Sequence, residues 1–129
     1  MVIGIGGVTI DRIAVIPRMP DWDDICYTND GSVQPGGMVA TAMVTAARLG
    51  VPARFIGGVG DDAEGKAVLA SFVSEGVDAS MVSTFPGETT AYSYILVHRD
   101  TGKRSIIHHR GVQERTSLPS NHFSFDGVA

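Results

Sequence analysis

Short apolar runs alternate along the chain with segments whose apolar residues recur at helical spacing. Residues 2–7 and 54–59 are rich in valine, isoleucine and glycine, which is typical of buried strands. Two longer segments carry apolar residues three and four positions apart, as an amphipathic helix does. The order strand, helix, strand, helix predicts βαβ units, and therefore an α/β fold in which helices flank a parallel sheet.

The first predicted helix begins after two glycines, Gly36 and Gly37, and ends at Leu49 and Gly50. Gly50 suits the left-handed conformation that often follows a helix, and Pro52 cannot continue one. One face of this helix carries small or medium-sized side chains, so it can pack closely on a sheet. These side chains are Val39, Ala42, Met43, Ala46 and Ala47.

The second predicted helix has a capping signal at its start. Asp61 is the expected N-cap, and Glu64 stands three residues later, as in a capping box. Gly76 is expected to end the helix. Its apolar face consists of Val68, Leu69, Phe72 and Val73.

Two hairpin-like segments do not fit a parallel sheet. Residues 12–33 hold an extended apolar stretch and a weak strand candidate at 25–33, which a turn signal at 29–31 interrupts. Residues 89–97 are rich in threonine, tyrosine, isoleucine and valine, and residues 104–109 can return as the second arm of a hairpin. These segments predict a small separate β layer that could serve as a lid.

Composition describes an ordinary globular chain of single-domain length. Of its 129 residues, 43% are hydrophobic and 19% are charged, which argues against disorder. No apolar run approaches the roughly 18 residues that a membrane helix needs. The single cysteine, Cys26, fits a reducing compartment, so we expect a cytoplasmic protein without a membrane partner. The polar tail at residues 117–129 receives no assignment.

Charge is unevenly distributed around a net value of -4. Residues 98–115 hold five basic side chains and two acidic ones, whereas most of the chain is acidic. An acidic chain with one short basic stretch does not resemble a nucleic-acid-binding protein. The stretch is either a solvated hairpin or a rim that meets an anionic ligand.

Two glycine-rich motifs imitate nucleotide-binding loops. Residues 4–6 begin like a dinucleotide fingerprint, but Thr9 stands where the third glycine belongs and no helix signal follows. Residues 60–67 imitate a Walker A loop, but Ala67 has no hydroxyl to hold magnesium, and three carboxylates would repel phosphate. A capped helix start is the better interpretation of this second motif.

Three local features qualify as candidate ligand contacts. Gly36 and Gly37 would let backbone N–H groups approach a ligand, although a tight turn needs the same residues. Asp11 follows a buried strand, near the edge where α/β proteins bind ligands, and would equally suit a turn or a cap. His108 and His109 are adjacent on a predicted strand, so their side chains point to opposite faces. We expect no metal site, and one of the two histidines facing a ligand cleft.

Taken together, these motifs resemble the N-terminal part of the ribokinase-like PfkB family of carbohydrate kinases. The resemblance covers roughly residues 1–115 and rests on an ordered series of segments rather than on any one motif. The segments are IGIGG at 3–7 leading to Asp11, QPGG at 34–37, FIGGVGDD at 55–62 with Gly65, and GETTA at 87–91.

The resemblance implies a ribokinase-like fold, a parallel sheet flanked by helices with a small β-sheet lid, and transfer of the ATP γ-phosphoryl group to a hydroxyl of a sugar or nucleoside. The cofactors implied are ATP and Mg²⁺, and the lid would also pair two subunits into a homodimer. By residue-wise match, the substrate-binding residues would be Asp11, Gly36, Gly37 and Thr41. The lid contacts would be Thr90, His108 and His109.

Two departures from the family pattern concern the substrate. Thr41 stands where the family usually has asparagine, and Met38 stands where a small or polar residue is usual. Asparagine offers a donor and an acceptor on a longer arm, whereas methionine offers neither at useful strength. The sequence therefore does not identify the sugar.

A further departure is the absence of the family's Gly-Ala-Gly-Asp segment, which carries the catalytic aspartate and holds phosphate. We therefore expect residues 1–129 to be the N-terminal part of one ribokinase-like domain, with lid strands within 12–33 and 89–109. We expect the chain to contain no catalytic residue and to bind neither ATP nor Mg²⁺ by itself. The alternatives are a nucleoside kinase of the same fold and a non-catalytic binding or dimerisation module.

Overall fold

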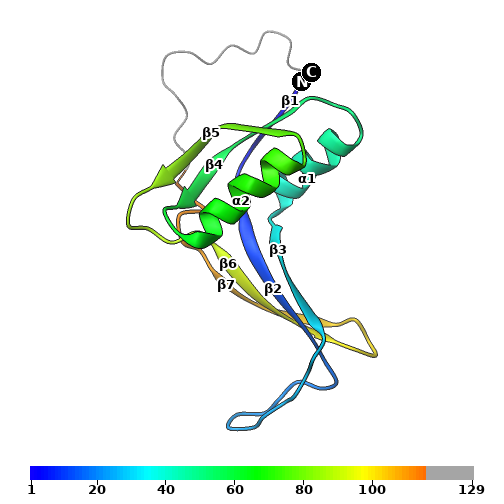
Figure 1. Cartoon of the computed structure of the whole chain (residues 1–129). Helices are drawn as coiled ribbons and strands as arrows, with labels where there is room; N and C mark the ends of the chain where they lie inside the picture. The colour runs from blue at the N-terminus through cyan, green and yellow to red at the C-terminus, as the bar shows by residue number, and fades with distance from the viewer. Residues whose placement is uncertain (116–129) are drawn as a thin grey trace.

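The computed structural model describes residues 1–115, in which seven strands form two sheets and two helices pack on one of them. Figure 1 shows the arrangement. In chain order the elements are β1 (Val2–Ile5), β2 (Thr9–Ile16), β3 (Gly31–Gly36), α1 (Met38–Arg48), β4 (Ala53–Gly60), α2 (Ala63–Ser74), β5 (Val77–Phe85), β6 (Tyr92–His98) and β7 (Arg104–His109).

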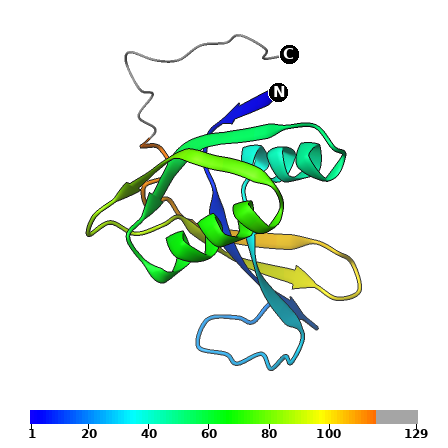
Figure 2. The ribbon, with the colours of Figure 1, turned by 45° about the horizontal axis from the view of Figure 1, so that its top comes forward.

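The first sheet, which we call the core sheet, contains three parallel strands in the order β1-β4-β5. Helix α1 packs on β1 and β4, and α2 packs on β4 and β5. Both helices lie on the same face of the sheet (Figures 1 and 2), as successive right-handed crossovers require. The central strand β4 is buried along most of its length, which explains its continuous apolar sequence.

The second sheet, which we call the mixed sheet, has the strand order β3-β2-β6-β7. Strand β2 is parallel to β6 and antiparallel to β3, and β7 closes an antiparallel hairpin with β6. The mixed sheet extends away from the core sheet and its helices (Figure 1). The predicted α/β fold with a second, small β-sheet is therefore confirmed, although β2 begins earlier and β3 ends later than residues 12–33.

One hydrophobic core joins the two sheets to the helices. Phe55 of β4 and Phe72 of α2 are buried, and their ring centroids lie 4.9 Å apart. Val8, just before β2, and Ile10, near its start, belong to the same buried cluster. The root of the mixed sheet is thus fixed to the core, because its first apolar residues share that core's packing.

The expected first helix is confirmed at both ends. Gly37 is its N-cap with φ 99°, a left-handed value that favours glycine. Leu49 is the C-cap, and Gly50 follows with φ 81°. The local glycine signals therefore located this helix correctly.

The predicted start of the second helix is wrong by one residue. Asp62, and not Asp61, is the N-cap, and its carboxylate accepts a 2.8 Å hydrogen bond from the Gly65 amide. The Asp61 amide instead donates to the Phe85 carbonyl, and this bond holds Asp61 beside the end of β5. Glu64 forms an ion pair with Arg12 of β2 rather than a capping box.

Two strand expectations also need correction. The candidate at residues 25–33 becomes a strand only from Gly31 onwards, because the Thr28 hydroxyl bonds to the Val15 carbonyl and holds the preceding segment as a loop. Strand β5 was not among the expected elements. It lies at the edge of the core sheet, where polar and apolar residues mix and the signal of a buried run is missing.

The polar tail at residues 117–129 lies outside the described residues. Within residues 1–115, neither helix is long and apolar enough to cross a bilayer.

Candidate functional site

Asp11 lies at the junction between the mixed sheet and the start of α1. It is two residues from Thr9 on β2, so both side chains point to the same face of the sheet. The Thr9 hydroxyl donates a 2.7 Å hydrogen bond to Asp11 Oδ1. On the neighbouring strand, Gly36 is paired with Thr9, and a Cβ atom on Gly36 would overlap the Asp11 carboxylate. The missing side chain of Gly36 therefore makes room for this carboxylate.

Gly37 brings two backbone segments into close approach at the same junction. An added Cβ would lie 2.8 Å from the Gly7 carbonyl oxygen and 3.1 Å from Val8 Cα. Both this contact and its φ of 99° require glycine. The N-terminus of α1 can thus lie directly beside the loop between β1 and β2.

Asp11 and Gly37 line a cavity of about 370 Å³ between the mixed sheet and the start of α1, which we call the Asp11 cavity. It is open to solvent at the side of Met38, whose side chain is 91% exposed. Its other lining residues come from the β1–β2 loop, β2, α1, β6, β7 and the segment after β7. They are Gly7, Thr9, Val39, Ser93, Ile95, Ile106, His108 and Gln113.

The two adjacent histidines of β7 point to opposite faces, as predicted. His108 lies over the Asp11 cavity, with Nδ1 3.0 Å from the Ser93 hydroxyl and Nε2 2.7 Å from Gln113 Oε1. His109 stacks on the Tyr92 ring, with centroids 4.6 Å apart, on the other face of the sheet. Only His108 is therefore placed to meet a ligand in this cavity.

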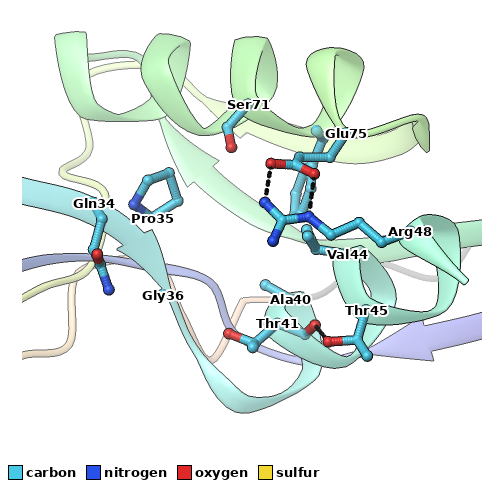
Figure 3. A pocket seen from close by; sticks show the side chains of 11 residues that line it. Gln34, Pro35, Gly36, Ala40, Thr41, Val44, Thr45, Arg48, Ser71 and Glu75 are labelled. Carbon is cyan, nitrogen blue, oxygen red and sulfur yellow. Dashed lines mark hydrogen bonds and ion pairs between the residues drawn. The ribbon is translucent and has the colours of Figure 1, made fainter.

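Thr41 lies outside the Asp11 cavity. It lines a groove of about 390 Å³ between α1 and α2, which Figure 3 shows from close by. Each helical residue advances about 100°, so Thr41 lies about 200° around α1 from Val39, which faces the Asp11 cavity. Thr41 therefore does not share a cavity with Asp11 in the structure, in contrast to the expectation from the family pattern.

An ion pair closes one end of this groove. The Arg48 guanidinium donates bidentate hydrogen bonds of 2.7 and 2.5 Å to the Glu75 carboxylate, and so joins the C-terminal ends of α1 and α2 (Figure 3). These bonds lower the pKa of Glu75 below its ordinary value. The groove thus contains an ion pair whose two charged groups are bonded to each other.

Thr90 is held within the protein and has no exposed surface. Its hydroxyl donates 2.6 Å to Asp62 Oδ1 and accepts 2.9 Å from the Gly60 amide, while its own amide donates 2.8 Å to Asp62 Oδ2. Partial burial acts to raise the pKa of Asp62, but the bonds from Thr90 and Gly65 outweigh it and keep the pKa low. The structure thus uses the Thr90 hydroxyl to hold Asp62 and Gly60, and the role of Thr90 as a lid contact stays a prediction.

The segment that imitates a Walker A loop is a capped helix start. The Gly65 amide, which such a loop would present to phosphate, donates to the Asp62 carboxylate instead. Lys66 is exposed in the first turn of α2. Among residues 1–115, no three histidine, cysteine, aspartate or glutamate side chains are grouped as ligands of one metal ion.

Ser93 and Gln113, the polar partners of His108 in the Asp11 cavity, were not among the sequence candidates. Ser93 could have been found from strand pairing, because it lies directly opposite His108 on the β6–β7 hairpin. Gln113 follows the hairpin in an irregular segment, and no periodic signal marks it. Both residues contact His108, so they belong to the same wall of the cavity.

Comparison with known proteins adds a family to this geometry. The profile of the pfkB family carbohydrate kinases matches residues 1–123. The chain is 27% identical over 113 residues to the ribokinase of Haemophilus influenzae; this match covers 88% of the chain and 37% of that protein. The chain therefore spans little more than a third of the length of this relative.

Solved structures of ribokinases have the same fold over the described residues. The ribokinase of Arabidopsis thaliana, solved with ribose and ATP, matches with a TM-score of 0.74 and 27% identity, over 86% of this chain and 36% of that one. The ribokinase of Cryptococcus neoformans var. grubii, solved with ADP, matches with a TM-score of 0.78 and 25% identity. This match covers 98% of this chain and 39% of that one.

Proposed function

The chain belongs to the pfkB family of carbohydrate kinases, and on this premise we propose that it forms the sugar-binding part of an ATP-dependent sugar kinase. The observation that carries the proposal is that Asp11 and Gly37 line one open cavity, while Gly36 packs against the Asp11 carboxylate. An ionised carboxylate accepts hydrogen bonds only, and it can take two neighbouring hydroxyls of a sugar. We propose that Asp11 binds the sugar in this way.

In the proposed reaction, a sugar hydroxyl oxygen attacks the γ-phosphorus of ATP, the bond from that phosphorus to the bridging oxygen breaks, and ADP leaves. The transfer depends on positioning of the reactants and on stabilisation of the transferred charge. The contribution of this chain is positioning, because Asp11 is fixed by Thr9 and fits beside Gly36. We propose that the residue that accepts the proton lies outside residues 1–129.

We propose that the described residues bind neither ATP nor Mg²⁺, and the contacts of one helix start support this. The helix start that imitates a phosphate loop presents the Asp62 carboxylate at the amide where phosphate would bind. We propose that the full-length protein uses ATP with Mg²⁺ through segments that are absent from this chain. The chain alone is then expected to bind neither.

We propose that the mixed sheet acts as a lid over the sugar and as the surface that pairs two subunits. Alternation along the strands places apolar residues on the same face as Asp11. Ile106, which lines the Asp11 cavity and pairs with Ile95 across the hairpin, is 52% exposed. A closed lid excludes water, and this favours transfer to the sugar over hydrolysis of ATP.

The test uses the purified full-length protein with ATP, Mg²⁺ and a panel of D-ribose, D-fructose, D-glucose, adenosine and cytidine. We expect ADP release that depends on one or more of the sugars, and no turnover by a sample containing only residues 1–129. Turnover with nucleosides alone would favour a nucleoside kinase of the same fold. The absence of turnover with every compound would favour a non-catalytic binding or dimerisation module and would overturn the proposal.

A further inference from the structure

A chain of polar side chains forms the wall of the Asp11 cavity on the side of the mixed sheet. His108 lies in its middle, between Ser93 on β6 and Gln113 after β7, at 3.0 and 2.7 Å. In the amide orientation that turns Gln113 Oε1 toward the ring, the oxygen accepts and His108 Nε2 carries the donated proton. In the neutral ring, Nδ1 then accepts from the Ser93 hydroxyl, so each member of the chain fixes the orientation of the next.

Gln113 is also held from behind, by the loop between β1 and β2. A Cβ atom on Gly7 would lie 2.6 Å from Gln113 Cγ and 3.1 Å from Cδ, so the side chain packs directly on the glycine. The backbone N–H of Gln113 donates a 3.0 Å hydrogen bond to the Arg110 carbonyl. The neighbouring Val112 is buried, and its amide bonds to the Thr89 carbonyl. Backbone and side chain of Gln113 are therefore both positioned.

This arrangement leaves the side-chain amide nitrogen of Gln113, Nε2, available to a ligand. The side-chain amide has one oxygen, which accepts from His108, and an NH₂ group with two donors. Gln113 and Asp11 both line the cavity, and Asp11 only accepts hydrogen bonds. The cavity thus combines a donor with an acceptor, and this combination suits hydroxyl groups, which do both.

The charged side chains around the cavity restrict the chemical class of the ligand further. Among the residues of 1–115 that line it, none is a lysine or an arginine, and Asp11 is the one carboxylate. The nearby Arg110 forms an ion pair with Glu114. A phosphate or carboxylate on the ligand would therefore meet Asp11 without a fixed counter-charge, at an electrostatic cost.

We propose that Gln113, oriented by His108, is a specificity-determining residue that donates a hydrogen bond to a hydroxyl of a neutral, unphosphorylated sugar. The inference rests on the proposed function, and it adds the residue and the charge class of the substrate. His108 is a positioning residue in this scheme, because it acts through Gln113. The basic residues after β6 then belong to a solvated hairpin and do not recognise an anionic substrate.

The test compares variants of the full-length protein in sugar kinetics and in thermal unfolding with and without sugar. Gln113→Glu keeps the size and the acceptor for His108 but removes both donors, so its sugar KM should rise by more than that of Gln113→Ala. For the alanine variant, loss of one hydrogen bond predicts a rise of about two- to tenfold. The KM for ATP and the Tm without sugar should stay close to the wild-type values in both variants.

A second pair of variants tests the positioning role. His108→Leu should raise the sugar KM by releasing Gln113, and the double variant His108→Leu/Gln113→Ala should be no worse than the more affected single variant, because the two residues act as a unit. Additive effects in this cycle would overturn the positioning role. His98→Ala is the matched histidine control, since His98 lies at the far end of β6.

The outcomes separate this inference from the proposed function. An unchanged sugar KM in Gln113→Glu overturns the inference while the kinase function stands. If wild type transfers phosphate to no sugar, the kinase function fails, and the Tm measured with D-ribose or D-fructose then tests the inference. A rise in the Tm of wild type that is lost in Gln113→Glu supports the inference. The absence of any rise in wild type overturns it. Preference for D-gluconate or fructose 6-phosphate over the neutral sugars also overturns it.

Discussion

The carboxylate of Asp11 occupies the space that a side chain on Gly36 would need. The two residues are 25 positions apart, and they meet because the antiparallel pairing of β2 and β3 puts Thr9, the hydrogen-bond partner of Asp11, opposite Gly36. A glycine at the end of β3 is thus a condition for the orientation of a carboxylate on the neighbouring strand. Most of the following predictions depend on contacts of this kind, between segments distant in sequence.

Gly36→Ala should disturb the sugar site without unfolding the protein. The added methyl group overlaps the Asp11 carboxylate, which must rotate away from its position beside Thr9. We expect the sugar KM of the full-length protein to rise about tenfold or more, since one hydrogen bond to a charged group contributes about 1.5–3 kcal/mol. Steady-state kinetics with a varied sugar concentration measure this effect.

Gly50→Ala is the matched control for that substitution. Gly50 has φ 81° and open space around it, so the change strains the backbone by about 1–2 kcal/mol but moves no site residue. Its Tm should fall while its sugar kinetics stay normal. A lower Tm with normal kinetics in Gly36→Ala as well would show that Asp11 does not depend on Gly36.

Asp11→Asn should weaken sugar binding or catalysis and leave the fold intact. Asparagine keeps the shape and one oxygen that can accept from Thr9, but it loses the charge and the second acceptor. The sugar kcat/KM should fall by about tenfold to over a hundredfold, with little change in the KM for ATP. If the variant instead melts earlier and has normal sugar kinetics, Asp11 is a structural residue.

Lys66→Ala tests the interpretation of the false phosphate loop. The side chain is exposed in the first turn of α2, so the free energy of unfolding should change by well under about 1 kcal/mol. The affinity of the full-length protein for ATP should stay the same in a calorimetric titration, as it should in the control Lys103→Ala. A large loss of ATP affinity confined to Lys66→Ala would mean that this loop binds phosphate.

Asp62 should give the protein a stability that is lost in acid. Bonds from Thr90 and Gly65 keep the pKa of Asp62 below its unfolded value of about 3.9, despite the opposing effect of burial. The stabilisation is therefore fully present above about pH 4 and disappears as the pH falls through the lowered pKa. Loss of the cap in Asp62→Ala should cost about 1–2 kcal/mol at pH 7 and make the Tm less sensitive to acid.

Melting curves of wild type and Asp62→Ala between about pH 3 and pH 7 check the prediction. This range begins roughly one pH unit below the unfolded pKa of Asp62. Asp61→Ala is the neighbouring control, because its side chain is exposed and Asp61 is not the cap. Equal losses of stability in the two variants would contradict the role given to Asp62.

Arg12 and Glu64 should couple the mixed sheet to α2. The Arg12 guanidinium lies 2.5 Å from the Glu64 carboxylate and over the ring of Tyr92, 5.0 Å from its centroid. Both charged side chains are about one-third exposed, so a double-mutant cycle with Arg12→Met and Glu64→Gln should give a coupling of about 0.2–1 kcal/mol. Denaturant unfolding of the four proteins measures this coupling free energy. A value of zero would mean that the ion pair does not stabilise the packing of the mixed sheet on α2.

The sequence by itself determined the features that depend on neighbouring residues. Helix α1 was predicted at both ends, because glycine conformation and apolar spacing act within a few residues of each other. The opposite directions of His108 and His109 followed from the alternation of a strand. The family series of glycine motifs likewise indicated the fold, since each glycine serves a local turn or a close backbone approach.

Only the tertiary structure decided the features that depend on pairing between distant segments. Asp61 has the local capping-box spacing to Glu64, yet Asp62 is the cap, and it is held by bonds from Thr90, 28 residues later. The register of β6 and β7 set His108 beside Ser93, and the packing of Gly7 brought Gln113 to the same wall. The rotation of α1 turned Thr41 into another groove. Such choices are made by long-range hydrogen bonds and packing, which leave no periodic pattern in the sequence.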